Sequence, residues 1–287
     1  MCTGTFRGLR RLSMEMLKLK ILVAAFAGII GTTGLSWAAG AESLTVGAPP
    51  SLRPAFSEIL PMFEREYNAP IKIVYTPSKT LLHQIEKGAP IDVFLSAGKE
   101  EVEYLHKKGL TLNGPPRIYA QTSLVLVMSS DSPSSLTSLR DALSNRSLRI
   151  ALGDPQTSSL GDATVRALNK LFPGYKNRSN VVYAPHSEDI MEMIRTGKAD
   201  VGLVYRVDSI NSGHVRISDD DPFGTLLPIQ FGQAVASTCR PSLRSAAEQF
   251  SSFLMTPRIQ KLLAKYGFDA APLPVDQTPR DKKEKVS

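Results

Sequence analysis

The sequence predicts an α/β protein with two lobes, each a mostly parallel sheet flanked by helices. Short apolar runs of strand length alternate with segments of helical periodicity, a pattern typical of parallel sheets with helices on both faces. This alternating series occurs twice along the chain, which indicates two lobes. With 42% hydrophobic and 21% charged residues, the 287-residue chain has the balance of a globular protein that buries a substantial core.

Residues 1–41 are predicted to be a cleaved secretory signal peptide. Lys18 and Lys20 precede an apolar run, 21–30, and then small residues. This run of about ten residues is too short to cross a membrane, which takes about 20 residues. Removing residues 1–38 takes away five basic residues and one acidic residue, and so lowers the formal net charge from +7 to +3. The basicity of the chain therefore gives no case for nucleic-acid binding.

The first α/β series accounts for the start of the exported chain. Its strands are predicted at 44–48, 71–75 and 92–96, and its helices at 52–67 and 79–87. In the first helix Phe56, Ile59, Leu60 and Phe63 have the spacing of one buried face.

The second series begins after a linker-like break at 113–116. A strand at 123–128 leads to further strands at 149–152, 181–184 and 200–205, with helices at 162–171 and 188–196. A return strand, 226–236, and helices at 243–254 and 258–265 are expected to pack back on the first lobe. We therefore predict lobe I at 42–121 and 233–270, lobe II at 122–232, hinges near 121–123 and 230–232, and a disordered tail at 271–287.

Ligands of open parallel sheets bind beyond the carboxyl ends of the strands, where each strand turns into a helix. Four such turns consist mainly of hydroxyl-bearing, small and proline residues: 48–51, 76–80, 153–161 and 185–190. Each would present free backbone N–H groups and a partial positive charge, which suits an anion. The alternative for Ser51, Ser78 and Ser187 is that they only cap their helices.

Several segments in sequence order resemble the molybdate-binding proteins of bacterial ABC importers: 84–97, Gly153-Asp154-Pro155, Gly202-Leu203-Val204-Tyr205 and Lys265-Tyr266-Gly267-Phe268. The similarity spans about 44–268. It implies a two-lobed periplasmic-binding-protein fold with the ligand in the interlobe cleft. It also implies a periplasmic, monomeric protein that is not an enzyme, needs no cofactor, and delivers molybdate or tungstate to a membrane permease.

The resemblance also implies which residues hold the anion. By position they are the hydroxyl groups of Ser51, Ser78 and Tyr205 and the backbone N–H groups of Leu160 and Ile190. Molybdate at neutral pH is a proton-free dianion, so a pocket of donors suits it, whereas a nearby carboxylate would repel it. None of the matched positions is acidic, although Asp154, Glu188 and Asp189 lie close in sequence.

Two turns depart from the family pattern. Pro49-Pro50 stands where small residues are usual, and Lys79-Thr80 follows Ser78 where serine or glycine is common. Pro50 has no N–H to donate, and Lys79 either points to solvent or adds a charged contact. These departures leave sulfate, thiosulfate or another tetrahedral oxyanion as the alternative ligand.

The sequence gives little support for catalysis, metal binding or gene regulation. There is no Ser-His-Asp order, metal triad or phosphate loop, and the four histidines lack metal-ligand spacing. The acidic run 219–221 reads as a solvated turn. The export signal, with no helix-turn-helix before the first lobe, argues against a transcription regulator of the same fold. Cys2 leaves with the signal, so Cys239 remains alone and is predicted to be a small buried apolar residue.

Overall fold

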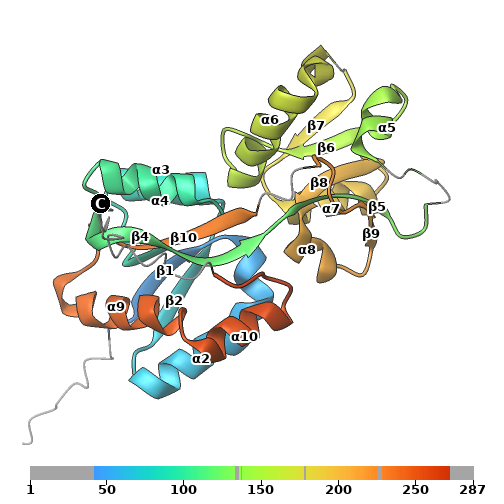
Figure 1. Ribbon diagram of the computed structural model, residues 1–287. Coiled ribbons are helices and arrows are strands. Elements are labelled where there is room, and N and C mark those ends of the chain that lie inside the picture. The colour runs from blue at the N-terminus through green and yellow to red at the C-terminus, as the bar shows by residue number, and fades with distance from the viewer. Residues whose placement is uncertain (1–41, 133–135, 137, 178, 225–227, 272–287) are drawn as a thin grey trace, which may run out of the picture. The chain divides into compact units, whose positions relative to one another are not determined.

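A computed structural model describes residues 42–132, 136, 138–177, 179–224 and 228–271, which belong to a compact unit, Glu42–Ser287. The predicted signal peptide and residues 272–287 of the predicted tail lie outside the described residues. The described chain has the predicted α/β class, with two sheets that are each flanked by helices (Figure 1). No helix among these residues is long and apolar enough to cross a membrane.

The first sheet has the strand order β2-β1-β3-β10-β4. Its strands are β1 (Leu44–Ala48), β2 (Ile71–Tyr75), β3 (Val93–Ser96), β4 (Thr111–Thr122) and β10 (Ile229–Ala236). β1 pairs in parallel with β2 and β3, and β10 runs antiparallel to β3 and β4. The carboxyl ends of the three parallel strands therefore lie at one edge of this sheet.

The second sheet repeats this plan in the order β7-β6-β8-β5-β9. Its strands are β5 (Leu124–Ser129), β6 (Ile150–Gly153), β7 (Val181–Ala184), β8 (Val201–Tyr205) and β9 (Val215–Asp219). β6 pairs in parallel with β7 and β8, and β5 runs antiparallel to β8 and β9. In both sheets the first parallel strand lies between the second and the third. Each sheet therefore places the carboxyl ends of three neighbouring strands side by side.

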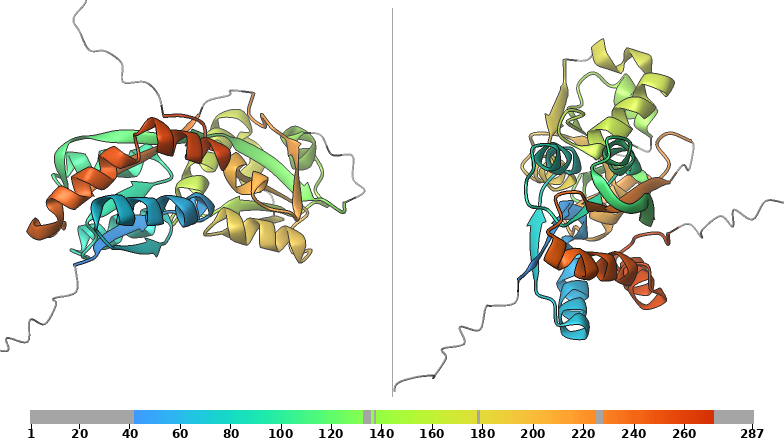
Figure 2. Two further views of the ribbon diagram at one scale, coloured as in Figure 1. Left: turned by 90° about the horizontal axis from the view of Figure 1, so that it is seen from below. Right: turned by 90° about the vertical axis from the view of Figure 1, so that its left-hand side faces the viewer.

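Helices cover both faces of the first sheet (Figures 1 and 2). One face carries α3 (Ser78–Glu86) and α4 (Lys99–Lys107), and the other carries α2 (Arg53–Tyr67), α9 (Arg244–Phe253) and α10 (Pro257–Lys265). Short 3-10 turns, η1 (Pro50–Leu52) and η3 (Pro241–Leu243), precede α2 and α9. Side chains alternate along β3: Phe94 packs with α3 and α4, while Val93 and Leu95 join the opposite core. There Phe63 packs edge-on against Phe250, with ring centroids 5.0 Å apart.

The second sheet is covered in the same way. Its helices are α5 (Leu139–Ser144), α6 (Ser159–Leu171) and η2 (Pro173–Asn177), with α7 (Ser187–Arg195) and α8 (Arg206–Ile210). Alternation along β5 again separates two cores: Leu126 and Met128 pack with α5 and α6, while Val125 and Val127 pack on the side of α7 and α8.

The segment predicted as a linker-like break at 113–116 lies inside strand β4, so that prediction was wrong. β4 is an edge strand, and its pairing with β10 shifts register between Arg117 and Leu112. An edge position and a bulge are where proline is tolerated, since its missing N–H breaks no ladder bond there. The helix α4 and strand β9 were not predicted. β10 lies in the first sheet, although its first four residues fall in the range predicted for lobe II.

A buried carboxylate fixes the start of β3. Asp92 is fully buried and accepts hydrogen bonds from the backbone N–H of Thr45 at 2.7 Å and from Arg240 Nη2 at 2.5 Å. Cys239 lies beside this pair and is buried, which confirms its prediction. Burial, together with the negative charge of Asp92, raises the pKa of the Cys239 thiol to about 11, so the thiol stays protonated and unreactive.

Candidate functional site

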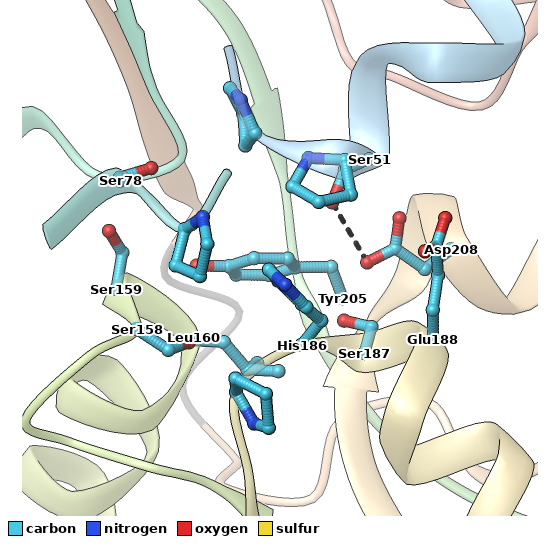
Figure 3. Close-up of a pocket in the computed structure, with 14 residues that line it drawn as sticks. Ser51, Ser78, Ser158, Ser159, Leu160, His186, Ser187, Glu188, Tyr205 and Asp208 are labelled. Carbon is cyan, nitrogen blue, oxygen red and sulfur yellow. Dashed lines mark hydrogen bonds between the residues drawn. The ribbon is translucent and has the colours of Figure 1, made fainter. Parts of the chain in front are cut away.

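A small pocket lies at the carboxyl ends of strands from both sheets, where the following helices begin (Figure 3). Its free volume is about 30 Å³, far below the 300–1,000 Å³ of pockets for drug-sized ligands, so it suits a small ion. The lining residues follow β1, β2, β6, β7 and β8: Pro49, Pro50, Ser51, Pro77, Ser78, Ser158, Ser159, Leu160, Pro185, His186, Ser187, Glu188, Tyr205 and Asp208.

The two predicted serines of the first sheet both line the pocket, and neither makes a capping hydrogen bond. Ser78 is buried, and its Oγ accepts a hydrogen bond from the N–H of Ala97 at 2.9 Å, which leaves the hydroxyl proton available to a ligand. Ser51 lies in η1, and its hydroxyl donates to Asp208 Oδ2 at 3.0 Å. Ser51 is therefore already committed to an acceptor that was not predicted.

The start of α6 brings Leu160 to the pocket. Its N–H is in the first turn, where a helix offers no internal acceptor. Ser158 caps this helix and accepts from the N–H of Gly161 at 3.3 Å. A Cβ on Gly161 would lie 2.4 Å from the carbonyl carbon of Asp154, and one on Gly153 would lie 2.5 Å from the Gly161 nitrogen. Glycine at both positions therefore lets the loop fold tightly against the helix start and aim its N–H groups at the pocket.

The start of α7 differs from the prediction. Ile190 is fully buried, does not line the pocket, and donates its N–H to the carbonyl oxygen of His186 at 3.2 Å. This is the first internal bond of the helix, so the free N–H groups of this turn belong to the residues just before Ile190. Ser187 lines the pocket instead. Its buried hydroxyl makes no hydrogen bond of good geometry among the described residues, although it lies close enough to Asp208 to lower the pKa of that carboxyl.

Tyr205 ends β8, is buried, and lines the pocket as predicted from position. Its hydroxyl donates to the carbonyl oxygen of Ala97 at 3.1 Å, while the Ala97 N–H donates to Ser78. The ring of Tyr205 packs edge-on against Phe231, with centroids 5.4 Å apart. The peptide groups of Ala97 thus connect the two candidate hydroxyl groups. Anion binding by these residues stays a prediction.

None of the matched positions is acidic, but an acidic residue that was not predicted, Asp208, lines the pocket. Burial raises the pKa of the Asp208 carboxyl to about 6; the hydroxyl groups of Ser187 and Ser51 oppose the rise, and the charge of Glu188 adds to it. Glu188 also lines the pocket but is exposed. A signal for Asp208 is present in the sequence, since it lies in the first turn of α8, directly after the strand β8 that ends at Tyr205.

Asp154 and Asp189, the other two acidic residues close in sequence to the matched positions, do not line the pocket. Asp154 Oδ1 accepts from the N–H of Gln156 at 2.9 Å and so stabilises its own loop. Asp189 Oδ2 is buried without a partner among the described residues.

In the described part of the chain, neither lysine nor arginine lines the pocket. An anion there would be held by hydroxyl groups, by free N–H groups and by the partial positive charge of helix starts rather than by a cation. In the described part of the chain, no three histidine, cysteine, aspartate or glutamate side chains are placed to hold a metal ion.

Around the pocket, side chains of the first sheet's helices contact those of the second. Lys79 donates to the carbonyl oxygen of Pro155 at 2.8 Å and lies 3.4 Å from Asp162 Oδ1. Ser159 donates to the buried carboxylate of Glu101 at 2.7 Å. Burial raises the pKa of Glu101, while the hydrogen bond from Ser159 lowers it. Lys79, a departure from the family pattern, is thus a charged contact rather than a free side chain.

The comparisons with known proteins agree on one family. Residues 44–269 match the family model described as bacterial extracellular solute-binding protein. A Bacillus subtilis protein described as an ABC transporter substrate-binding lipoprotein is 28% identical over 229 residues, which are 79% of this chain and 86% of the relative. The molybdate-binding protein of Haemophilus influenzae is 25% identical over 256 residues, covering 88% of this chain and 99% of the relative.

Solved structures share the fold. The periplasmic molybdate-binding protein of Azotobacter vinelandii aligns with a TM-score of 0.66 at 22% identity, covering 80% of this chain and 100% of its own. A sulfate-binding protein of Mycobacterium tuberculosis aligns with a TM-score of 0.67 at 19% identity, covering 82% and 88%. At these identities the likeness establishes the fold only.

Proposed function

Because the chain belongs to the family of bacterial extracellular solute-binding proteins, we propose that it captures molybdate or tungstate and delivers the anion to the permease of an ABC importer. Members of this family are binding proteins and not enzymes, and so is this chain. We further propose that it works as a monomer in the periplasm after its signal peptide is cleaved. The relatives that support molybdate are only 25–30% identical to this chain. The family is therefore established, and the identity of the bound anion is what we propose.

The observation that carries the proposal is the pocket formed by strand-to-helix turns of both sheets. It is small, it contains no lysine or arginine, and it offers the buried hydroxyl groups of Ser78 and Ser187 together with the N–H of Leu160. Uncharged donors suit an anion that only accepts hydrogen bonds. The free volume of about 30 Å³ excludes peptides and sugars from this conformation.

Sulfate is the second candidate. The solved sulfate-binding protein shares the fold, and sulfate is also a tetrahedral dianion that accepts hydrogen bonds only. Selectivity between such anions depends on pocket radius and on donor placement, which differ by fractions of an ångström.

A thermal-shift panel tests the proposal. The purified protein is heated with molybdate, tungstate, sulfate, thiosulfate or phosphate, each with sodium as the counterion and at equal ionic strength. Ligand at about 100 times its Kd stabilises a protein by about 2.7 kcal/mol, which raises the Tm by several degrees. We expect molybdate and tungstate to raise the Tm at the lowest concentrations. A shift with sulfate alone would make sulfate, and not molybdate or tungstate, the ligand of this protein. No shift with any of the five anions would refute oxyanion binding.

A further inference from the structure

Asp208 is an unexpected group in a pocket for an anion. Its carboxylate lines the pocket with Ser51 and Ser187 (Figure 3), and its Oδ2 accepts a hydrogen bond from the Ser51 hydroxyl, with the two oxygens 3.0 Å apart. Among the residues that the structure describes, no lysine or arginine lines the pocket to neutralise it. An ionised carboxylate beside a bound dianion is strongly disfavoured, because like charges in a poorly solvated site repel.

The hydrogen bond from Ser51 to Asp208 makes the pocket still less favourable for an anion. A serine hydroxyl carries one proton. While Ser51 donates it to Asp208, Ser51 presents only lone pairs to the pocket, and those lone pairs also repel an anion. Protonation of Asp208 resolves both difficulties, since the carboxylic acid can donate to Ser51 Oγ and so release the hydroxyl proton of Ser51 toward the ligand.

We propose that the pocket binds a tetrahedral oxyanion together with one proton, which Asp208 takes up from solvent when the dianion enters. Asp208 is then the proton-binding residue of the proposed anion site, and this inference rests on the proposed function. The only covalent change is the O–H bond formed on the Asp208 carboxylate, at the expense of a proton from water or buffer.

Burial already raises the pKa of Asp208 in the free protein to about 6, so the uptake of a proton near neutral pH costs little free energy. The other ionisable side chains around Asp208 are Tyr205 at the end of β8 and five groups on or next to α7 and before β9: His186, Glu188, Glu192, Arg195 and His214. Glu192 and Arg195 pair with each other at 2.6 Å. Arg206, on the same helix as Asp208, is exposed. His186 and His214 also lie beside Asp208 and need their own controls.

The sign of the effect follows from linkage. Above the pKa of the free site Asp208 is ionised and must gain a proton before the dianion binds, so affinity falls as pH rises. With one proton taken up per anion, the Kd rises about tenfold for each pH unit, until the pH reaches the raised pKa of the complex.

Titration calorimetry with sodium molybdate tests the proposal. Kd is measured from about pH 6.5 to about pH 8.5, and protons are counted at about pH 7.5 in buffers of different ionisation enthalpy. The purified protein should take up close to one proton per molybdate. Asp208→Asn keeps the shape but cannot ionise, so it should take up none, lose the pH dependence, and bind at least about tenfold tighter at the alkaline end.

Three variants serve as matched controls: Glu188→Gln, His186→Gln and His214→Gln should each keep the proton uptake, whatever they do to Kd. Molybdate binding with no proton uptake by the unmodified protein would overturn the proposal, and so would uptake that survives in Asp208→Asn or disappears in a histidine variant. If Asp208→Asn does not fold, the buffer series on the unmodified protein decides alone. A protein that binds no oxyanion at any pH would refute the proposed function itself.

Discussion

The candidate donors are small groups, and neighbouring contacts decide what each can offer a ligand. Ser78 and Ser51 are both serines at helix starts. The Ser78 Oγ accepts a hydrogen bond and its O–H stays free to donate, whereas the Ser51 O–H donates a hydrogen bond to Asp208. Sequence position placed Ser51, Ser78, Leu160 and Tyr205 at one pocket but could not show this difference. It also put the donor of α7 too far along the helix, because whether an N–H is free depends on where the helix begins.

Leu160 provides a test at this scale. We expect Leu160→Ala to lower the free energy of unfolding by about 2–5 kcal/mol, because the side chain is buried, but to leave the Kd for molybdate within about threefold. Leu160→Pro loses the same side chain and also the N–H, at the second helical position, where that N–H has no acceptor within the helix. A hydrogen bond to a charged group contributes about 1.5–3 kcal/mol, so this Kd should rise at least tenfold. Equal Kd values in calorimetry would remove the Leu160 N–H from the site.

At the scale of elements, local sequence patterns located most of the regular segments, although the helices α4, α5 and α8 were missed. β1, β2 and β7 have the predicted bounds, and helices differ from prediction by a few residues at their ends. β4 was missed because its prolines read as a break, and only its pairing with β10 at the sheet edge makes it a strand. Long-range pairing of that kind leaves no periodic signal in the strand itself.

The ion pair of Arg240 with Asp92 joins η3 to the start of β3 and gives a test at this scale. Burial raises the pKa of Asp92, but the hydrogen bonds from Arg240 and Thr45 outweigh it, and the net pKa is lowered. The pair therefore stabilises the fold above the ordinary carboxyl pKa, and this stability is lost as pH falls through the lower folded pKa.

We expect Arg240→Met to lower the free energy of unfolding by about 3–5 kcal/mol at neutral pH, because it leaves a buried carboxylate unpaired. The deficit should shrink toward pH 3–4 as Asp92 becomes protonated. Arg149→Met, which breaks the exposed pair with Asp200, is the matched control and should cost at most about 1 kcal/mol. Urea titrations at several pH values measure both, and equal losses for the two variants would contradict the account.

Across the whole described unit, the two sheets repeat one strand order, and that repetition is the feature the sequence showed most clearly. The alternating series predicted two α/β halves before any contact was known. Lys79, Ser159 and Tyr205 make contacts that join the two halves across the pocket. These contacts could not be predicted from the sequence, because each joins two segments far apart in the chain and depends on how both are folded. The predicted lobe boundaries and hinges stay predictions.

Lys79 tests how these contacts contribute to closure on a ligand. Lys79→Met removes the bonds to Pro155 and Asp162, so we expect a larger radius of gyration for the ligand-free protein in small-angle X-ray scattering. The Kd for molybdate should rise up to about fivefold, the scale of a partly exposed ion pair, and less at high salt. Lys72→Met, at an exposed position on β2, is the control. A radius and Kd unchanged by Lys79→Met would show that the contact does not favour closure.

The most direct measurement is a crystal structure of the protein with sodium molybdate, with data collected at the molybdenum absorption edge. The account predicts a single strong anomalous peak in the pocket, with oxygens within hydrogen-bonding distance of Ser78, Ser187, the N–H of Leu160 and Ser51 or Tyr205. An anomalous peak at another place, or an empty pocket at saturating molybdate, would contradict it.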